Sequence, residues 1–219
     1  MPHGSPPAPA PIVLASRSPR RLELLSLLVP PARIVVCPPA SSAEPGFEGL
    51  TTLPAIESQA LSIAEAKRAA VAALRGPGFV LAADTVIVGG EVAQEGLVVL
   101  GQPPERPAGV EVVRGWFERF YFGRTHTALT AVAASSPAGM VRACAVRTQV
   151  TFSARHRDWL DWYLSSDEPW GKAGGYALQG LASLFVERVE GSLSNVVGLP
   201  LAETRELLKS LGALASAAR

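Results

Sequence analysis

A short segment near the start of the chain combines residue types that bind anions. An apolar run, Ile12–Ala15, leads directly into Ser16-Arg17-Ser18-Pro19-Arg20-Arg21, a stretch referred to below as the N-terminal turn. Ser18 followed by proline is typical of a helix start, where backbone N–H groups are free and the helix dipole is positive. With the Ser16 hydroxyl and two guanidinium groups, this strand-to-helix turn is suited to phosphate. A capped helix with solvated arginines is the alternative interpretation.

A carboxylate and a lysine form a second group of candidates. Asp84 follows the dense apolar run Phe79–Ala83, which predicts a buried strand that ends at this residue. The carboxyl ends of strands line the ligand crevice in open α/β sheets, so Asp84 is expected in that crevice. Lys67 lies near the edge of the apolar face of a helix predicted over Pro54–Leu74, from which it can reach a neighbouring cleft. A turn in which Asp84 bonds its own backbone explains that residue equally well.

A glycine-rich stretch, residues 171–180, carries a third group and is called the glycine segment below. It includes Lys172 and Gln179, polar side chains that can recognise a phosphate or a base. Glycines permit close approach of the backbone to a ligand, although a plain glycine-rich turn accounts for the same residues. The chain has neither a GxxxxGK[ST] pattern nor Gly-x-Gly-x-x-Gly after a strand, which excludes P-loop and Rossmann-type nucleotide sites.

Strand-like and helix-like runs alternate along the chain, which predicts an α/β fold. Without a clear linker, residues 12–215 are expected to form a single domain behind a flexible tail of residues 1–11. The expected strands are Ile12–Ala15, Arg33–Val36, Phe79–Ala83, Val86–Val88, Thr125–Ala134, Met140–Ser153 and Ser183–Val189, with a hairpin over Gly90–Gly101. The expected helices are Pro19–Leu28, Pro54–Leu74, Pro107–Phe122, Arg155–Leu164 and Leu201–Ala215.

Composition limits the class of partner. The 219 residues, 48% hydrophobic and 18% charged, are sufficient for a real core. A net charge of +1 argues against nucleic acid or an anionic membrane as partner, so we expect a small ligand bound by local charge. Met1–Pro11 lacks the features of a signal peptide, and no segment approaches the roughly 20 apolar residues that span a bilayer. We therefore expect a soluble, cytoplasmic protein, with Cys37 and Cys144 as buried free thiols.

Short motifs occur in the order and spacing of the Maf family, which the chain resembles from Ile12 to about Leu211. They are the N-terminal turn, Ala83-Asp84-Thr85, Gly101-Gln102-Pro103, Thr125-His126-Thr127, residues 172–180 and Gly198-Leu199-Pro200. The resemblance implies a nucleoside triphosphate pyrophosphatase, which cleaves between the α- and β-phosphates and releases a nucleoside monophosphate and pyrophosphate. It also implies an elongated mixed β-sheet flanked by helices in two lobes, similar to inosine triphosphate pyrophosphatases, with the site in the cleft between the lobes.

The resemblance assigns roles to the matching residues. Asp84 matches the carboxylate that activates water, and Lys67, expected to be catalytic with it, matches a phosphate-binding position. The other residues expected to bind phosphate or substrate are Ser16, Arg20, Arg21, Gln102 and Lys172. Arg20, Thr85 and Gln179 match positions at which branches of the family differ, and they resemble the branch acting on dTTP and UTP rather than the one acting on 7-methyl-GTP. The amide of Gln179 can both donate to and accept from a pyrimidine edge.

Two positions depart from the family pattern. Gln102 stands where a lysine is common and brings no charge, so weaker triphosphate binding is expected. A divalent cation (Mg2+, Mn2+ or Co2+) is implied, with Asp84 as a ligand. The second metal-binding carboxylate of the family is replaced here by Ala40 and Ser41. Glu44 is the nearest carboxylate that could take its place, and Glu48 is the alternative.

These departures leave a second hypothesis open, in which the chain is a nucleotide-binding regulator of cell division with weak or no turnover. The resemblance also makes a homodimer plausible. His126 and Thr127 are expected to be structural or one layer removed from the substrate, because the sequence identifies no partner for a lone histidine.

Overall fold

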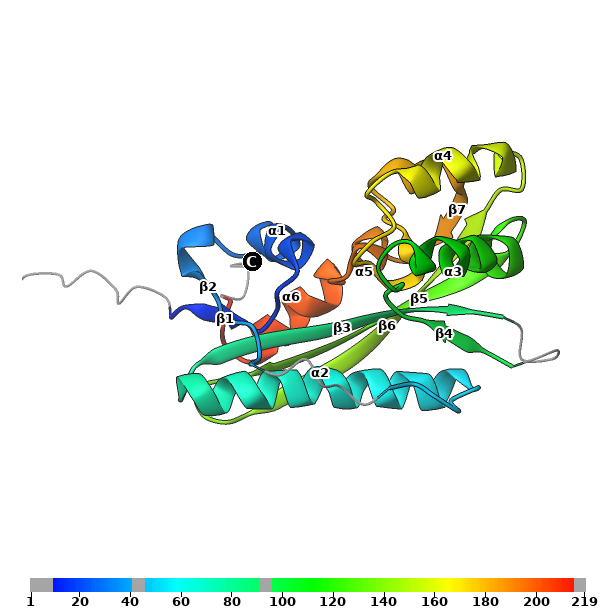
Figure 1. Ribbon diagram of the computed structural model, residues 1–219. Coiled ribbons are helices and arrows are strands. Elements are labelled where there is room, and N and C mark those ends of the chain that lie inside the picture. The colour runs from blue at the N-terminus through cyan, green and yellow to red at the C-terminus, as the bar shows by residue number, and fades with distance from the viewer. Residues whose placement is uncertain (1–9, 41–45, 91–95, 215–219) are drawn as a thin grey trace, which may run out of the picture.

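The computed structural model describes residues 10–40, 46–90 and 96–214, which contain a seven-stranded mixed sheet (Figure 1). Its strands are β1 (Ile12–Leu14), β2 (Ile34–Val36), β3 (Phe79–Gly89), β4 (Val98–Leu100), β5 (Thr125–Ser135), β6 (Val141–Phe152) and β7 (Val186–Glu190). They follow the order β2-β1-β3-β5-β6-β7, and β4 pairs with β3 outside this path. β1 runs parallel to β2 and β3, and the remaining pairs are antiparallel.

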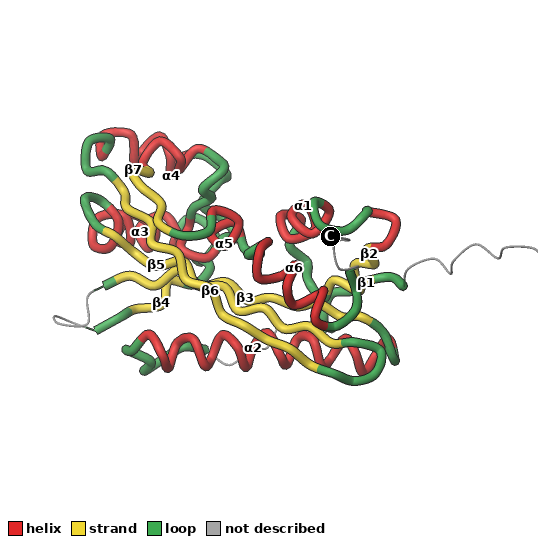
Figure 2. Tube along the Cα trace, turned by 180° about the vertical axis from the view of Figure 1, so that it is seen from behind, coloured by secondary structure: helices red, strands yellow, loops and turns green. Residues whose placement is uncertain are grey.

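Helices cover both faces of this sheet. The α-helices are α1 (Pro19–Ser26), α2 (Leu53–Arg75), α3 (Ala108–Trp116), α4 (Leu160–Ser165), α5 (Leu193–Val197) and α6 (Leu201–Ser210). The long α2 runs along one face, while α1 and α6 cover one end of the other face and α3, α4 and α5 rise from its other end (Figures 1 and 2). The predicted mixed sheet flanked by helices is thus confirmed. None of the helices in the described ranges is long and apolar enough to cross a membrane.

β3 is buried on both faces, which explains its nearly continuous apolar sequence. Val80 and Ala82 pack with residues of β1 and α2, and Val86 continues this face against α2 further along. Phe79 and Leu81 point the other way, into a core shared with α1 and α6. Since side chains alternate along a strand, Asp84 belongs to the face covered by α2 and Thr85 to the opposite face.

The prediction that a strand ends at Asp84 is wrong, because β3 continues through Asp84 and Thr85 to Gly89. Asp84 pairs in register with Ala131 of β5, and Thr85 with Thr130. The strand that ends is its parallel neighbour: Leu14, the last residue of β1, lies beside Leu81. One edge of β3 therefore loses its partner just before Asp84, and the chain turns there into α1.

Other predicted helix and strand boundaries differ from those in the structure, at places where the segment contacts distant parts of the chain. The helix predicted over Pro107–Phe122 leaves α geometry after Trp116 and continues as a π-helical turn, Phe117–Tyr121, whose aromatic rings enter the core. The strand predicted from Ser183 begins only at Val186, because a 3-10 helix occupies Leu181–Phe185. The Glu168 carboxylate accepts hydrogen bonds from the Leu181 and Ala182 backbone N–H groups at the start of that helix.

Smaller corrections concern helix ends and thiols. The helix predicted from Arg155 starts with a 3-10 turn at Arg157 before α4. The last helix ends at Ser210, and α5 was not predicted. Cys37 and Cys144 are free thiols, but they are half-buried rather than buried. The hairpin predicted over Gly90–Gly101 starts earlier, because its first strand is the end of β3 at Ile87–Gly89, which pairs with β4. Residues 91–95 lie outside the described part of the chain.

Candidate active site

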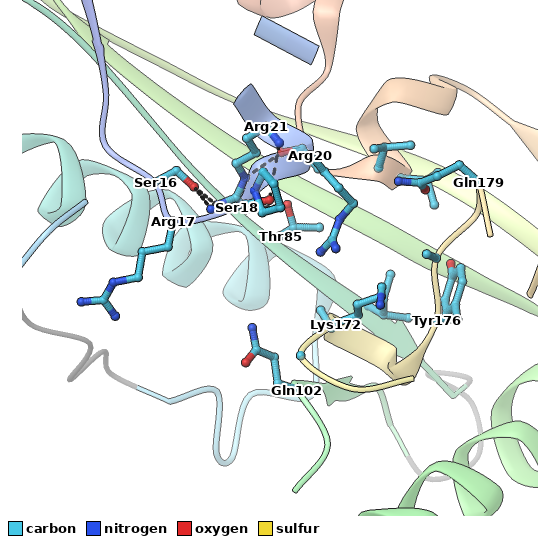
Figure 3. Close-up of a pocket in the computed structure, with 18 of the residues that line it drawn as sticks. Ser16, Arg17, Ser18, Arg20, Arg21, Thr85, Gln102, Lys172, Tyr176 and Gln179 are labelled. Carbon is cyan, nitrogen blue, oxygen red and sulfur yellow. Dashed lines mark hydrogen bonds between the residues drawn. The ribbon is translucent and has the colours of Figure 1, made fainter. Parts of the chain in front are cut away.

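A cavity of about 350 Å³ opens where β1 ends, between the N-terminal turn and the glycine segment (Figure 3). Its wall includes the ends of α1 and α5, residues of β3, and Gln102 after β4. Sites that bind small molecules commonly lie in clefts of about 300–1,000 Å³. Of the predicted site residues, those that line this cavity are Ser16, Arg20, Arg21, Lys67, Thr85, Gln102, Lys172 and Gln179.

The N-terminal turn forms the capped structure that its sequence predicts. Ser18 is the N-cap of α1 and its hydroxyl accepts from the Arg21 backbone N–H at 3.4 Å, with Pro19 at the first helical position. The buried Ser16 hydroxyl accepts from the Ser18 backbone N–H at 3.1 Å. The start of an eight-residue helix therefore faces the cavity with a serine hydroxyl and the positive end of its dipole.

The two neighbouring arginines have different surroundings. Arg20 extends into the cavity toward Lys172 and makes no hydrogen bond or ion pair with any described residue (Figure 3). The Arg21 guanidinium instead donates to the Gly198 carbonyl at 2.9 Å, to the Thr85 hydroxyl at 2.9 Å and to the Ser16 hydroxyl at 3.4 Å. Arg21 thus joins α1 to β3 and to the end of α5, and a phosphate ligand would compete with these internal acceptors.

Thr85 is held on both sides. Its hydroxyl accepts from Arg21 and lies 3.0 Å from the Thr130 hydroxyl, which donates to the Asn195 carbonyl at 3.0 Å. Asn195 is fully buried and its amide donates to the Ala128 carbonyl and the Thr148 hydroxyl. The predicted specificity residue Thr85 is therefore the start of a buried polar chain beneath the cavity.

Asp84 and Lys67 form a close ion pair. The Lys67 ammonium lies 2.8 Å from Asp84 Oδ1, and the two side chains are only 15% and 11% exposed. Lys67 comes from α2 and lines the cavity, so the carboxylate on the α2 face of β3 is linked to the cavity through the lysine. The expectation that Lys67 reaches a cleft is confirmed by its place in the wall. The carboxylate can accept a proton, and the ammonium can contact an anionic ligand in the cavity.

The glycine segment supplies the opposite wall, where Lys172, Tyr176 and Gln179 surround the cavity (Figure 3). Burial lowers the pKa of Lys172, the nearby charge of Arg20 lowers it further, and Glu168 raises it in part. Two cations thus face each other from the two sides, an arrangement that an anion between them would relieve. The Gly174 backbone N–H donates to the Gly101 carbonyl at 2.9 Å, which ties the segment to the residue before Gln102.

The structure does not bring every predicted residue to the cavity. Asp84 does not line the wall and is linked to the cavity by its ion pair with Lys67. Glu44 lies outside the described residues, and Glu48 is exposed and does not line the wall. No group of three or more His, Cys, Asp or Glu side chains that could hold a metal ion occurs within the described ranges. Sequence reasoning gave no role to Val196, Val197 or Tyr176, although they also line the cavity. The two valines carry no chemical signal and the Tyr176 hydroxyl faces a distant residue, so only their place in the fold identifies these residues.

Comparisons with known proteins show the family to which the chain is related. A family model described as Maf-like protein matches residues 11–211. A dTTP/UTP pyrophosphatase of Anaeromyxobacter dehalogenans (strain 2CP-1 / ATCC BAA-258) is 40% identical over 206 residues, which cover 92% of this chain and 94% of the relative. One of Syntrophus aciditrophicus (strain SB) is 36% identical over 204 residues, covering 93% and 91%. Among solved structures, a HAM1 protein from Coxiella burnetii has a similar fold, with a TM-score of 0.51, 16% identity and coverage of 92% and 99%.

Proposed function

Because this chain belongs to the Maf-like protein family, we propose that it is a nucleoside triphosphate pyrophosphatase that hydrolyses dTTP and UTP to the monophosphate and pyrophosphate. The observation that carries the proposal is the cavity itself. Arg20, Lys172 and Lys67 converge on it from different elements, and the last of these pairs with a nearly buried carboxylate. A cavity with several cations and a carboxylate suits a polyphosphate that must be both bound and attacked by water.

The proposed reaction breaks the bond between the α-phosphorus and the oxygen that bridges it to the β-phosphorus. A water oxygen attacks the α-phosphorus, and the electron pair of the broken bond leaves on pyrophosphate. We assign Asp84 as the acceptor of the water proton and Lys67 as the cation that contacts the phosphates. Arg20 and the start of α1 offset the negative charge that grows on the leaving group, and Lys172 contributes to binding the triphosphate. Positioning and charge neutralisation carry most of the catalysis in phosphoryl transfer.

A divalent cation fits the residues present. Asp84 Oδ1 accepts from Lys67, whereas Oδ2 has no hydrogen-bond partner among the described residues. Magnesium at phosphate sites is commonly held by one or two carboxylates, with waters and substrate phosphates as the other ligands. We propose that Asp84 holds this ion, which would supply charge neutralisation at the phosphates when bound. Mg2+, Mn2+ and Co2+ all remain candidates, and Glu44 remains the proposed second carboxylate.

For the base, we propose that Gln179 reads the pyrimidine edge. Gln179 is exposed, lines the cavity and carries a primary amide that both donates and accepts. Thr85 acts differently, since its hydroxyl is already engaged by Arg21 and Thr130. We propose that Thr85 influences selectivity through Arg21 and the N-terminal turn, not through contact with the base.

Cytoplasmic localisation and a homodimer are retained as parts of the proposal.

The test is pyrophosphate release from a panel of nucleoside triphosphates with Mg2+, Mn2+ or Co2+. We expect release from dTTP and UTP by the wild type and its loss, by a factor of about 100 or more, in Asp84→Asn. The matched control is Glu187→Gln, which neutralises an exposed carboxylate outside the cavity wall and should change little. Nucleotide binding without release by the wild type would overturn the proposal and favour the regulator hypothesis, and equal release by Asp84→Asn would overturn the assignment of Asp84.

A further inference from the structure

Three buried side chains hold three consecutive residues of the glycine segment. Each bond joins a ring from the π-helical turn Phe117–Tyr121, α4 or β5 to the segment, and all are between 2.8 and 2.9 Å. The Tyr121 hydroxyl donates to the Gly174 carbonyl, the Tyr163 hydroxyl donates to the Gly175 carbonyl, and His126 Nε2 shares a hydrogen bond with the Tyr176 hydroxyl. The segment is therefore fixed from beneath at its centre, between Lys172 and Gln179.

The backbone of the segment cannot easily take another form. Gly174 and Gly175 have φ angles of +70° and +68°. A Cβ at Gly174 would lie 2.6 Å from both Ile87 Cγ1 and the Tyr121 hydroxyl. Since only glycine adopts this backbone without strain and without overlap, the two glycines allow the segment to seat directly on the aromatic core.

His126 is the least expected member of this arrangement. It is 2% exposed, and its Nδ1 atom has no hydrogen-bond partner among the described residues. Its ring packs against Tyr121 and Phe152, with centroids 4.4 and 5.1 Å away. A phenylalanine would serve such packing without the cost of burying a polar ring. The Tyr176 hydroxyl is the hydrogen-bond partner that the structure gives this imidazole. This hydrogen bond is therefore what histidine contributes at this position and phenylalanine could not.

Tyr176 connects this bond to the cavity. It is 5% exposed and lines the cavity, and its hydroxyl hydrogen-bonds to His126. Lys172 and Gln179 lie on either side of it in the chain and point toward the same space (Figure 3). A shift of Tyr176 would therefore move the cation proposed for phosphate and the amide proposed for the base together.

We propose that His126 is a positioning residue of the nucleotide site, which fixes the glycine segment through its hydrogen bond to Tyr176 and so orients Lys172 and Gln179. This inference rests on the proposed function, because it takes those two side chains as nucleotide ligands. Through this hydrogen bond a histidine outside the cavity wall would affect binding inside it. The effect should appear mainly in binding, because the segment contacts parts of the substrate that do not react.

The kinetic test uses His126→Phe, which keeps an aromatic ring and removes the hydrogen bond. We expect the KM for dTTP to rise about tenfold, equivalent to about 1.4 kcal/mol, with kcat within about twofold of the wild type. His126→Gln, whose amide can reach the Tyr176 hydroxyl, should recover most of the loss. Tyr176→Phe should reproduce it, and the double variant should be no worse than either single one. An unchanged KM in a folded His126→Phe protein would overturn the proposal.

A second measurement needs no turnover. Hydrogen exchange of the free protein should show faster exchange over residues 172–180 in His126→Phe, but not in His126→Gln. Leu208→Ala is the matched control, because it removes a buried side chain of α6 that does not line the cavity. It should lower the melting temperature without selective exchange in the glycine segment. If the wild type released no pyrophosphate, the proposed function would fail alone, whereas unchanged exchange in His126→Phe would refute the positioning role.

Discussion

An alanine substitution should weaken nucleotide binding at Arg20 and lower protein stability at the neighbouring Arg21. The sequence gives both the same prediction, phosphate binding, but the structure leaves Arg20 without a hydrogen bond among the described residues and gives Arg21 acceptors on two other elements. We expect Arg20→Ala to weaken nucleotide binding at nearly unchanged stability. We expect Arg21→Ala to lower stability first, because it disconnects α1 from β3 and from the end of α5.

The loss of stability expected for Arg21→Ala depends on which hydrogen-bond donors each acceptor retains. The Ser16 hydroxyl still accepts from the Ser18 backbone N–H, and the Thr85 hydroxyl still has Thr130. The Gly198 carbonyl loses the donor that the structure gives it at 2.9 Å. A hydrogen bond to a charged group contributes about 1.5–3 kcal/mol, so at this half-buried site we expect a loss of about 2 kcal/mol. For a chain of this size that lowers the melting temperature by about 4–8 °C.

For Arg20→Ala, loss of one charged phosphate contact should raise the KM for dTTP about 10- to 100-fold, with the free energy of unfolding within about 0.5 kcal/mol of the wild type. The assay pairs chemical denaturation with steady-state pyrophosphate release for both variants. Arg21→Lys serves as a further control, since it keeps the charge but not the fork of donors and should remain destabilised. A stable Arg21→Ala protein, or an Arg20→Ala protein that loses as much stability, would refute this reasoning.

Three further outcomes are expected. Gly174→Ala should lower the melting temperature at least twice as much as Gly171→Ala, because both have positive φ but only the first places a Cβ against Ile87; equal losses in thermal unfolding would contradict this. Burial lowers the pKa of His126 to about 3, so below about pH 6.5 this residue binds a proton in the unfolded chain but not in the folded one. The free energy of unfolding should therefore fall by up to about 1.4 kcal/mol for each unit by which the pH is lowered. Denaturation between about pH 6 and pH 4 should show a shallower slope in His126→Gln, and identical slopes would exclude this histidine as the cause. Gln102→Lys should lower the KM for dTTP about two- to fivefold at low salt by adding a cation to the cavity wall, and an unchanged KM would indicate that this side chain does not meet the phosphates.

Local chemistry made the N-terminal turn predictable from the sequence. A serine followed by a proline starts a helix through contacts within a few residues, and the structure has Ser18 as N-cap and Pro19 at the first helical position. The alternation of strands and helices was predictable for the same reason, because it follows from periodicities of neighbouring residues. The motif order also indicated the family, which the comparisons show. The sequence alone thus determined the fold class and the main cavity residues.

Long-range partners decided the rest. In the sequence, Asp84 and Thr85 indicate the end of a strand. In the structure they lie in the middle of β3, where Lys67 of α2 neutralises Asp84 and Arg21 and Thr130 hydrogen-bond to Thr85. His126 shows no partner in the sequence, because Tyr176 lies 50 positions away. Burial of a polar group is stable only when a partner is present, and sequence does not show which distant residue will meet it. Tertiary structure therefore decided which arginine hydrogen-bonds to distant elements, where the carboxylate lies and what holds the glycine segment.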